Sequence, residues 1–140
     1  MKLLIVDGNA AVRRLIRGIV ASFADEIHEC ANGMDALAAY VAHTPDLVLM
    51  DMAMEKLDGI AATKEIRLAH PAAKIIIVAD YDDLALREAA WSAGACGYVP
   101  KENLLDLVRL LEAYRDSNSD DFQRSVQERK DDYTEIVLEY

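Results

Sequence analysis

The sequence predicts an α/β domain in which helices cover both faces of a doubly wound, five-stranded parallel sheet, giving three layers. The main observation is an alternation, repeated five times over residues 1–115, of a short aliphatic run and a longer segment with apolar residues at helical spacing. Compact aliphatic runs are typical of parallel strands that are buried on both faces. With 140 residues, of which 53% are hydrophobic, the chain is long enough for one domain with its own core.

The first two units precede residue 45. The run at residues 3–6 is short and β-branched, so it predicts a buried strand that ends at Asp7. A helix follows, with arginines outside and an inward stripe of Val12, Leu15, Ile16, Ile19, Val20 and Phe23. Residues 26–30 predict a weaker second strand. The turn Asn32-Gly33 then leads into a helix that carries Met34, Leu37, Ala38 and Val41.

Three further units repeat this order. A strand at residues 47–50 stops at Asp51, and Asp58-Gly59 closes a loop before a helix that carries Ile60, Ala61, Ile66 and Leu68. A strand at residues 75–78 stops at Ala79-Asp80, and a helix at residues 84–93 has Gly94 as its C-cap. A fifth strand is predicted at residues 96–99. A last core helix is predicted at residues 103–114. Its inward side chains are Leu104, Leu107, Val108 and Leu111.

Residues 116–140 form an acidic extension beyond the predicted domain of residues 1–115. The extension holds three Lys/Arg and eight Asp/Glu residues, a net charge of −5. We interpret it as an amphipathic helix with an apolar stripe of Phe122, Val126, Tyr133, Ile136, Val137 and Tyr140. A disordered acidic end, or the start of a linker, is the alternative.

The net charge of −10 argues against binding to nucleic acid or to an anionic membrane, and it is compatible with a cation site built from carboxylates. Cys30 and Cys96 form no zinc motif, and His28, His43 and His70 have no metal-ligand spacing. The apolar run before Asp7 is too short for a signal peptide, and no stretch approaches the roughly 20 apolar residues of a membrane span. A cytoplasmic location is therefore expected.

Three charged residues follow predicted strands. Asp7 and Asp51 come at the carboxyl ends of the first and third strands, and Lys101 follows the fifth. Carboxyl ends of parallel strands meet at one edge of the sheet, where such folds bind ligands. Two carboxylates and an amine there are the parts of a site for Mg²⁺ and a phosphoryl group. Capping of helices by the two aspartates is the alternative interpretation.

Several motifs give the sequence a family resemblance. They are LIVD at 4–7, NGMDAL at 32–37, PDLVLMD at 45–51, Met54 with Asp58-Gly59, and AGACGYV at 93–99 before Lys101. Over residues 1–115 the chain resembles the receiver domain of two-component response regulators. The resemblance implies a flavodoxin-like fold. It also implies that a partner histidine kinase or phosphotransfer protein supplies a phosphoryl group, with at most self-phosphorylation and autodephosphorylation as activity.

The resemblance also implies roles for individual residues. Asp51 matches the phosphate acceptor, and Lys101 matches the lysine that pairs with it or with its phosphate. Asp7, Asp51 and the backbone carbonyl of Ala53 match the positions that hold Mg²⁺. Tyr98 matches an aromatic switch residue that turns inward on activation. Downstream partners would bind a face that includes Arg87, Trp91, Tyr98 and Lys101.

The sequence departs from the family pattern at the site. Gly8 replaces the second of two adjacent acids, so a carboxylate ligand is missing and weaker Mg²⁺ binding is expected. Ala79 replaces a threonine or serine whose hydroxyl binds the phosphoryl group, so a bond of about 1.5–3 kcal/mol is missing. Glu55 and Pro100 are smaller departures. Glu55 or Asp80 is a possible substitute for the missing acid.

Two functions remain open at this point. The first is a phospho-receiver at Asp51 whose coupling between phosphate and conformation is weakened. The second is a pseudo-receiver, a protein-interaction module that phosphate does not control. Flavin binding is disfavoured because the segment after the first strand, at residues 8–11, is a poor phosphate-binding loop. Because no helix-turn-helix follows, direct DNA binding is not expected, and homodimerisation stays open.

Overall fold

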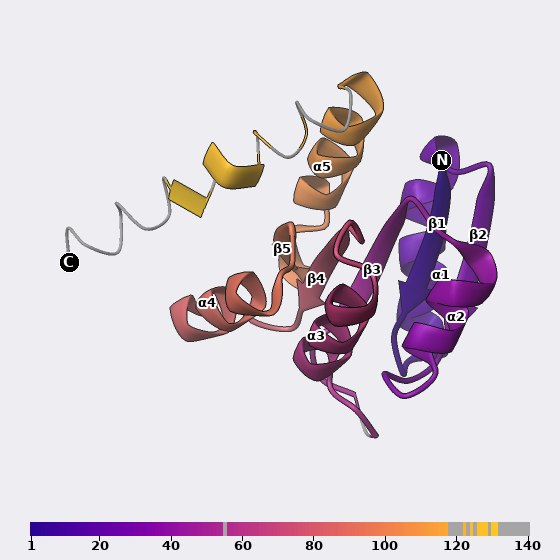
Figure 1. The fold of residues 1–140 in the computed structure, drawn as a ribbon. Helices are drawn as coiled ribbons and strands as arrows, with labels where there is room; N and C mark the ends of the chain where they lie inside the picture. The colour runs from indigo at the N-terminus through magenta and orange to yellow at the C-terminus, as the bar shows by residue number, and fades with distance from the viewer. Residues whose placement is uncertain (55, 118–121, 123, 125, 129, 132–140) are drawn as a thin grey trace.

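The computed structural model describes residues 1–54, 56–117, 122, 124, 126–128 and 130–131. A five-stranded parallel sheet lies between two layers of helices (Figure 1). The strands are β1 Lys2–Val6, β2 Glu26–Cys30, β3 Leu47–Asp51, β4 Ile75–Ala79 and β5 Gly97–Pro100. Apart from the partly exposed Lys2 at the start of β1, the three central strands are apolar up to their carboxyl ends and almost fully buried, which confirms the prediction of a sheet covered on both faces.

The strand order is β2-β1-β3-β4-β5. The chain passes from β1 outward to β2 and then returns across β1 to β3, so the direction of winding reverses between β1 and β3. In register, Leu3 to Val6 of β1 lie beside Leu47 to Met50 of β3. This pairing brings the residues that follow Val6 and Met50 to the same edge, at the switch point where doubly wound folds bind ligands.

The helices alternate with the strands and pack in two layers. They are α1 Ala10–Val20, α2 Ala36–His43, α3 Gly59–Ala69, α4 Leu84–Ala93 and α5 Leu105–Asp116, with short 3₁₀ turns at Ala21–Phe23 and Lys101–Asn103. One core cluster joins the sheet to α1 and α5 through Ile16, Val20 and Leu107. The other joins it to α2, α3 and α4, which lie together in Figure 1.

Side-chain caps fix the points at which three helices begin after the strand ends. The Asn9 side chain accepts from the N–H groups of Ala11 and Val12 at the start of α1. Asp58 caps α3 and Asp83 caps α4 in the same way. Each capped helix follows a loop at the carboxyl edge of the sheet, so these caps also fix the loops around the site.

Four large apolar residues at or near the predicted helices are not buried, and only one of them, Leu15, belongs to a stripe that was predicted to face inward. Leu15, Met34, Val41 and Leu68 are all exposed. Met34 precedes α2, whose buried residue is Ala36, and α3 instead buries Ala62, Thr63 and Ile66. Helices in a three-layer domain bury a narrow stripe, and small residues bring the backbone close to the sheet, so hydrophobicity alone overestimates the inward set.

The described residues of the extension return to the domain. Phe122, Arg124, Val126–Gln127–Glu128, Lys130 and Asp131 have helical backbone. Phe122 is fully buried and packs edge-on against Tyr114, with ring centroids 5.2 Å apart, and Val126 joins the same core cluster. The rest of the predicted apolar stripe, from Tyr133 onward, lies outside the described residues. Within the described part of the chain, no helix has both the length and the apolarity needed to cross a membrane.

Candidate functional site

Four charged residues converge at the carboxyl edge of the sheet, each at or just after the end of a different strand. Asp7 follows β1, Asp51 ends β3, Asp80 follows β4 and Lys101 follows β5. The Lys101 Nζ atom lies 3.0 Å from Asp51 Oδ1, 3.2 Å from Asp7 Oδ2 and 3.2 Å from Asp80 Oδ1. The predicted meeting of Asp7, Asp51 and Lys101 is thus seen in the structure, and Asp80 is a fourth member.

These residues line a cavity of about 500 Å³. Its wall also includes the β1–α1 loop, the first turn of α1, the turn after β2 and the loop after β3. The contributing residues are Gly8, Asn9, Val12, Ala31, Asn32, Ala53, Met54 and Lys56. Ala53, the predicted source of a metal-binding carbonyl, therefore faces the same space as Asp7 and Asp51. Glu55, the other possible substitute for the missing acid, lies outside the described residues.

Asp7 is almost fully buried, at 2% exposed. Its Oδ1 accepts from the Asn9 N–H at 2.8 Å. Its Oδ2 has no hydrogen-bond partner among the described residues and contacts only the ammonium of Lys101, as an ion pair. A buried carboxylate oxygen in this condition is a strong acceptor for a cation, because its desolvation is only partly offset.

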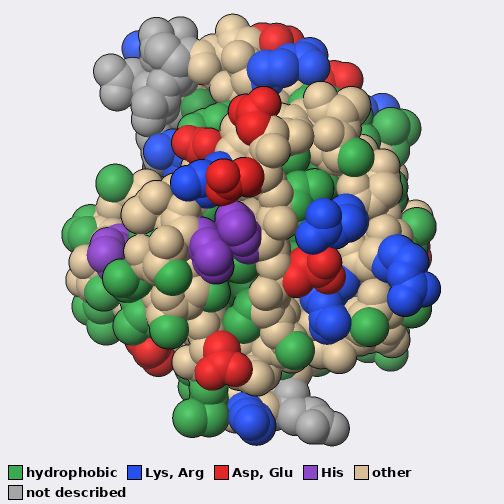
Figure 2. All heavy atoms as spheres, turned by 90° about the vertical axis from the view of Figure 1, so that its right-hand side faces the viewer, with side chains coloured by type: hydrophobic (Ala, Val, Ile, Leu, Met, Phe, Trp, Pro, Cys, Tyr) green, Lys and Arg blue, Asp and Glu red, His purple; other side chains and the backbone are tan. Residues whose placement is uncertain are grey.

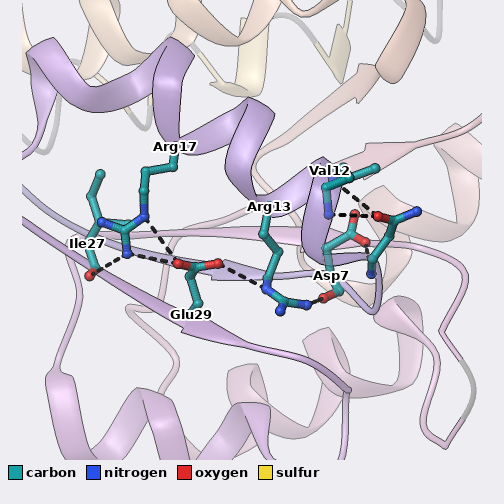
Figure 3. A network of polar contacts seen from close by, with 8 residues as sticks. Asp7, Val12, Arg13, Arg17, Ile27 and Glu29 are labelled. Carbon is teal, nitrogen blue, oxygen red and sulfur yellow. Dashed lines mark hydrogen bonds and ion pairs between the residues drawn. The ribbon is translucent and has the colours of Figure 1, made fainter.

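The backbone of Asp7 is held by a polar network between β2 and α1 (Figure 3). The Arg13 side chain donates to the Asp7 carbonyl at 2.7 Å and pairs with Glu29 at 3.0 Å, and Arg17 pairs with Glu29 at 2.9 Å. The two guanidinium groups hold the pKa of Glu29 below its usual value against the opposing effect of burial. The network ties the end of β1 to α1, and so fixes Asp7 in place.

Asp51 is 5% exposed, and its backbone position depends on a glycine. A Cβ atom on Gly59 would lie 2.0 Å from the carbonyl oxygen of Asp51, a distance that no side chain tolerates. The Gly59 N–H also donates to the Met52 carbonyl at 2.9 Å. The first residue of α3 therefore packs directly against the residue at the centre of the site, which explains the Asp58-Gly59 pair in the sequence.

Burial raises the pKa of Asp51, and the nearby charges of Asp7 and Asp80 raise it further, while Lys101 opposes the shift. Burial by itself would lower the pKa of Lys101, but the hydrogen bond and charge of Asp51, with Asp7 and Asp80, raise it above its ordinary value. Lys101 is therefore an ammonium ion at any physiological pH. Its positive charge offsets the mutual repulsion of the three neighbouring carboxylates, Asp7, Asp51 and Asp80.

The structure places Asp80 at Lys101. Its side chain is about half exposed, and it shares the ammonium with the two buried aspartates. Among the described residues, no three His, Cys, Asp or Glu side chains are arranged to hold a metal ion. Asp80 thus does not replace the missing acid at position 8 in this arrangement. Its place directly after β4 was the sequence signal for its location.

The two departures from the family pattern differ in their surroundings. Gly8 is exposed at the cavity, and a Cβ atom there would meet only the Ala31 carbonyl, at an ordinary 3.5 Å. A side chain at position 8 is therefore sterically allowed. Ala79 is buried at the end of β4, in register with Pro100 of β5. Its methyl group offers no hydrogen bond to a ligand in the cavity.

Tyr98 is buried in β5, at 5% exposed. Its hydroxyl donates to the carbonyl of Tyr81, and the Arg87 guanidinium lies over its ring, 4.8 Å from the centroid. Burial raises the pKa of its phenol, an effect that Arg87 opposes. Trp91 is half-buried, and its Nε1 has no hydrogen-bond partner among the described residues. The residues predicted to form a partner face are thus largely covered.

The three histidines lie away from this cavity. The rings of His28 and His43 stack with centroids 3.6 Å apart, and Figure 2 shows two histidine side chains in contact on the face that includes β2. His70 packs against Tyr40. Both cysteines are buried with free thiols, and burial raises the pKa of Cys30. None of these residues lines the cavity.

A doubly wound sheet with buried carboxylates and a lysine at its switch point defines a class of α/β domains suited to cation and phosphoryl chemistry. Within that class, the chain belongs to the response regulator receiver domain family, whose model matches residues 3–115. The family resemblance in the sequence is therefore confirmed. The chain is a receiver domain of two-component signalling, followed by the extension.

Comparisons with individual proteins agree. The chain is 37% identical to the chemotaxis protein CheY of Bacillus subtilis over 113 residues, which make up 80% of this chain and 92% of that protein. It is 33% identical to the DNA-binding transcriptional regulator NtrC of Salmonella typhimurium, where the match covers 77% of this chain but 23% of NtrC. It thus spans most of CheY and about a quarter of NtrC.

Solved structures give the same fold. A two-component response regulator of the LuxR family from Aurantimonas superimposes with a TM-score of 0.76 at 30% identity, covering 92% of this chain and 96% of that one. A CheX–CheY complex with BeF3 and Mg²⁺ from Borrelia burgdorferi matches with a TM-score of 0.66 at 26% identity, covering 72% of this chain and 78% of that one.

Proposed function

We propose that this receiver accepts a phosphoryl group on Asp51 from a histidine kinase or a phosphotransfer protein, and that phosphate controls its conformation only weakly. The supporting observation is the 3.0 Å contact between Lys101 Nζ and the buried Asp51 carboxylate inside an open cavity. A fixed ammonium beside a desolvated carboxylate is an arrangement that stabilises an incoming phosphoryl anion.

The transfer is a displacement at phosphorus. A carboxylate oxygen of Asp51 forms a P–O bond, the P–N bond of the donor's phosphohistidine breaks, and the electron pair of that bond leaves with the imidazole. The product is an acyl phosphate. Lys101 then faces more negative charge, and it balances this charge by pairing with a phosphoryl oxygen. Burial of Asp51 supports the step, since a poorly hydrated carboxylate loses little solvation when it attacks.

Receiver domains as a family bind Mg²⁺, and the residues here fit such an ion in part. Asp7, Asp51 and the Ala53 carbonyl line one cavity and offer the hard oxygen ligands that Mg²⁺ prefers. The buried Oδ2 of Asp7, which accepts no hydrogen bond among the described residues and is paired with Lys101, supports this assignment. Bound there, Mg²⁺ would offset the charge of the phosphoryl group. Gly8 supplies no carboxylate, so Mg²⁺ would be held more weakly there than by two adjacent acids.

Weak coupling follows from Ala79 and Tyr98. Ala79 has no hydroxyl with which to follow a phosphoryl group, so phosphorylation does not pull on the end of β4. Tyr98 is already buried, and the Tyr81 carbonyl holds its hydroxyl. This burial supports an inward position of Tyr98, of the kind that the family resemblance associates with activation. Phosphorylation is therefore expected to shift the equilibrium between the two conformations of the domain only slightly.

The test is intact-mass spectrometry after incubation with acetyl phosphate and Mg²⁺. A phosphate adduct on the wild-type chain that is lost in Asp51→Asn, but kept in Asp35→Asn, would support Asp51 as the acceptor. Lys101→Met is expected to slow the reaction by about 10-fold or more, because it removes the ammonium from the site. Failure of the wild-type chain to react, at magnesium concentrations in the tens of millimolar range, would contradict the proposal.

A second function is supported by the inward Tyr98 and by the contact of Lys101 with Asp80. Both contacts hold side chains of the unphosphorylated site in one position. An interaction module that phosphate does not control needs such a fixed surface. The two functions differ in one measurement. If the chain is an interaction module, treatment with acetyl phosphate leaves its affinity for a captured partner unchanged, so the wild-type chain and Asp51→Asn bind alike. If the chain is a phospho-receiver, the same treatment raises the affinity of the wild-type chain but not that of Asp51→Asn.

A further inference from the structure

Strand β5 is an edge strand whose burial needs an explanation. It lies at the end of the strand order, yet all four of its residues, Gly97–Pro100, are buried. Helices α4 and α5 flank it on the two faces of the sheet. An edge strand presents unpaired backbone groups, and proteins commonly cover such an edge. We call the surface formed by α4, β5 and α5 the β5 face.

The C-terminal extension contacts both helices of this face. Phe122 packs on Tyr114 of α5 and lies in the core cluster that includes Val99 of β5. The Lys130 ammonium lies over the ring of Trp91 of α4, 5.2 Å from its centroid. The two helices lie on opposite faces of the sheet, so a segment that reaches from one to the other must cross the β5 edge. In Figure 1 the described part of the extension runs from the end of α5 toward α4.

The contacts have helical spacing. Phe122, Val126 and Lys130 are four residues apart, their backbone is helical, and both Phe122 and Val126 are buried. Side chains four apart lie on one side of a helix. Between them, Arg124, Gln127 and Glu128 are exposed. The described residues of the extension from Phe122 to Asp131 therefore have an amphipathic helical pattern, with their apolar side chains facing the domain.

We propose that the chain's own extension, through Phe122, Val126 and Lys130, covers the β5 face in cis and competes there with the partners of that face. A downstream partner then binds by offering a helix with apolar side chains four residues apart and a basic residue for Trp91, and it must displace this segment. The extension is a built-in competitor, which sets the affinity threshold for any partner of this face.

The nature of the contact makes displacement feasible. Among the described residues of the extension, Phe122 and Val126 are the two buried ones, and Lys130 adds a cation–π contact. A partner helix that replaces two apolar anchors can compete, whereas it could not displace a core helix such as α5 with three fully or largely buried leucines. Competition between a tethered and a free helix is governed by the effective concentration of the tethered one.

Trp91 reports on this contact directly, because it is the only tryptophan of the chain. The test variant is Val126→Lys, which places a charge at a buried position of the extension. The control is Glu128→Lys, which gives the same new side chain at an exposed position and changes the charge by more. We expect quenching of Trp91 by acrylamide to rise on the order of twofold in Val126→Lys and to stay unchanged in the control.

A fluorescein-labelled peptide of residues 118–140 then tests binding to the β5 face in trans. We expect it to bind Val126→Lys and to bind the wild-type chain at least about 10-fold more weakly, because the segment in cis already fills the site. Unchanged quenching in a folded Val126→Lys, or no binding of the peptide to it, would overturn the proposal. A dimer of the wild-type chain in light scattering, lost in Val126→Lys, would also overturn it, since the segment would then dock on a second copy.

If circular dichroism shows that Val126→Lys is unfolded, the variant Lys130→Gln tests whether the extension is docked. It removes the cation from Trp91 without entering the core, so a shift in Trp91 emission with an unchanged melting temperature supports the docked extension, and no shift contradicts it. None of these variants touches Asp7, Asp51 or Lys101. Phosphorylation of Val126→Lys by acetyl phosphate therefore tests the proposed function separately.

Discussion

The carboxylate of Asp80 lies 3.2 Å from the ammonium of Lys101, so the lysine that holds Asp51 is shared with an acid at the end of the neighbouring strand. In this arrangement Asp80 competes with a phosphoryl group for the same cation, and its negative charge repels that group. The site therefore contains both the parts that accept a phosphoryl group and a part that opposes it.

Removal of that charge is expected to speed phosphorylation. We predict that Asp80→Asn reacts with acetyl phosphate about 2–5-fold faster than the wild-type chain, since a half-exposed charge at this distance contributes about 0.5–1 kcal/mol. The rate is measured by intact-mass spectrometry. Glu65→Gln, an exposed neutralisation on α3, is the control and is expected to change nothing. A slower Asp80→Asn would show that Asp80 assists the reaction.

Position 8 offers a gain-of-function test. Gly8→Asp adds a carboxylate to the cavity, and its Cβ meets only the Ala31 carbonyl at 3.5 Å, so no steric cost is expected. We predict that Mg²⁺ binds about 10-fold more tightly, because a direct charged ligand replaces water. Titration calorimetry measures the affinity, and Gly8→Asn, of the same shape without the charge, is the control. Equal affinities for the two variants would argue that position 8 does not reach the metal.

Position 79 tests the coupling of phosphate to conformation. Ala79→Thr restores a hydroxyl, and Ala79→Val has the same shape without it. At this buried position each is expected to lose about 1–3 kcal/mol of stability in the unphosphorylated chain. On phosphorylation, only the threonine variant gains a hydrogen bond, worth about 1.5–3 kcal/mol. Thermal melts with and without acetyl phosphate should therefore separate the two. Parallel behaviour would mean that residue 79 does not reach the phosphoryl group.

Asp51 gives the reaction a pH dependence. Its pKa is raised from the ordinary 3.8, mainly by burial, and only the carboxylate attacks. The rate of phosphorylation is therefore expected to fall on acidification at a higher pH than an exposed aspartate would show. Lys101 opposes the shift, so Lys101→Met should move the midpoint to still higher pH while lowering the maximal rate. Rates are measured with two phosphodonors of different acidity, and a midpoint that follows the donor contradicts the assignment.

The inward position of Tyr98 has a measurable stability. Tyr98→Phe removes the hydrogen bond to the Tyr81 carbonyl and should cost about 1 kcal/mol. This loss corresponds to a fall of about 3–4 °C in melting temperature for a domain of this size. Tyr81→Phe keeps the accepting carbonyl and is expected to melt like the wild-type chain. Identical melting of both variants would indicate that the bond contributes nothing to the inward state.

The architecture and most of the site could be predicted from the sequence because they depend on the chain's order. Parallel strands bring their carboxyl ends to one edge, so Asp7 and Asp51 were expected to meet if their strands were neighbours, as β1 and β3 are. The contact of Asp80 with Lys101 depends instead on how a long side chain bends within the cavity. No spacing rule gives that conformation.

The helix faces show a second limit. Leu15 was predicted to face inward because it is apolar, yet it is exposed, as is Leu68 of α3, whereas the small residue Ala62 of α3 is buried. A helix that packs close to the sheet has room only for small residues at the contact. Hydrophobicity scales carry no information on this distance. For the extension the sequence predicted an amphipathic helix but not its docking site, because an apolar stripe predicts that a face will be covered, but not which surface covers it.

The two edges of the sheet have a consequence for behaviour at high concentration. Strand β2 forms the open edge, and it carries Glu26 and Glu29 among five residues, with arginines of α1 beside it. At the other edge every residue of β5 is buried. Strand addition between molecules is the first step of β-aggregation, and it needs an accessible, uncharged edge. Neither edge meets that condition, so we expect the chain to remain free of fibrils at millimolar concentration for as long as β5 stays covered.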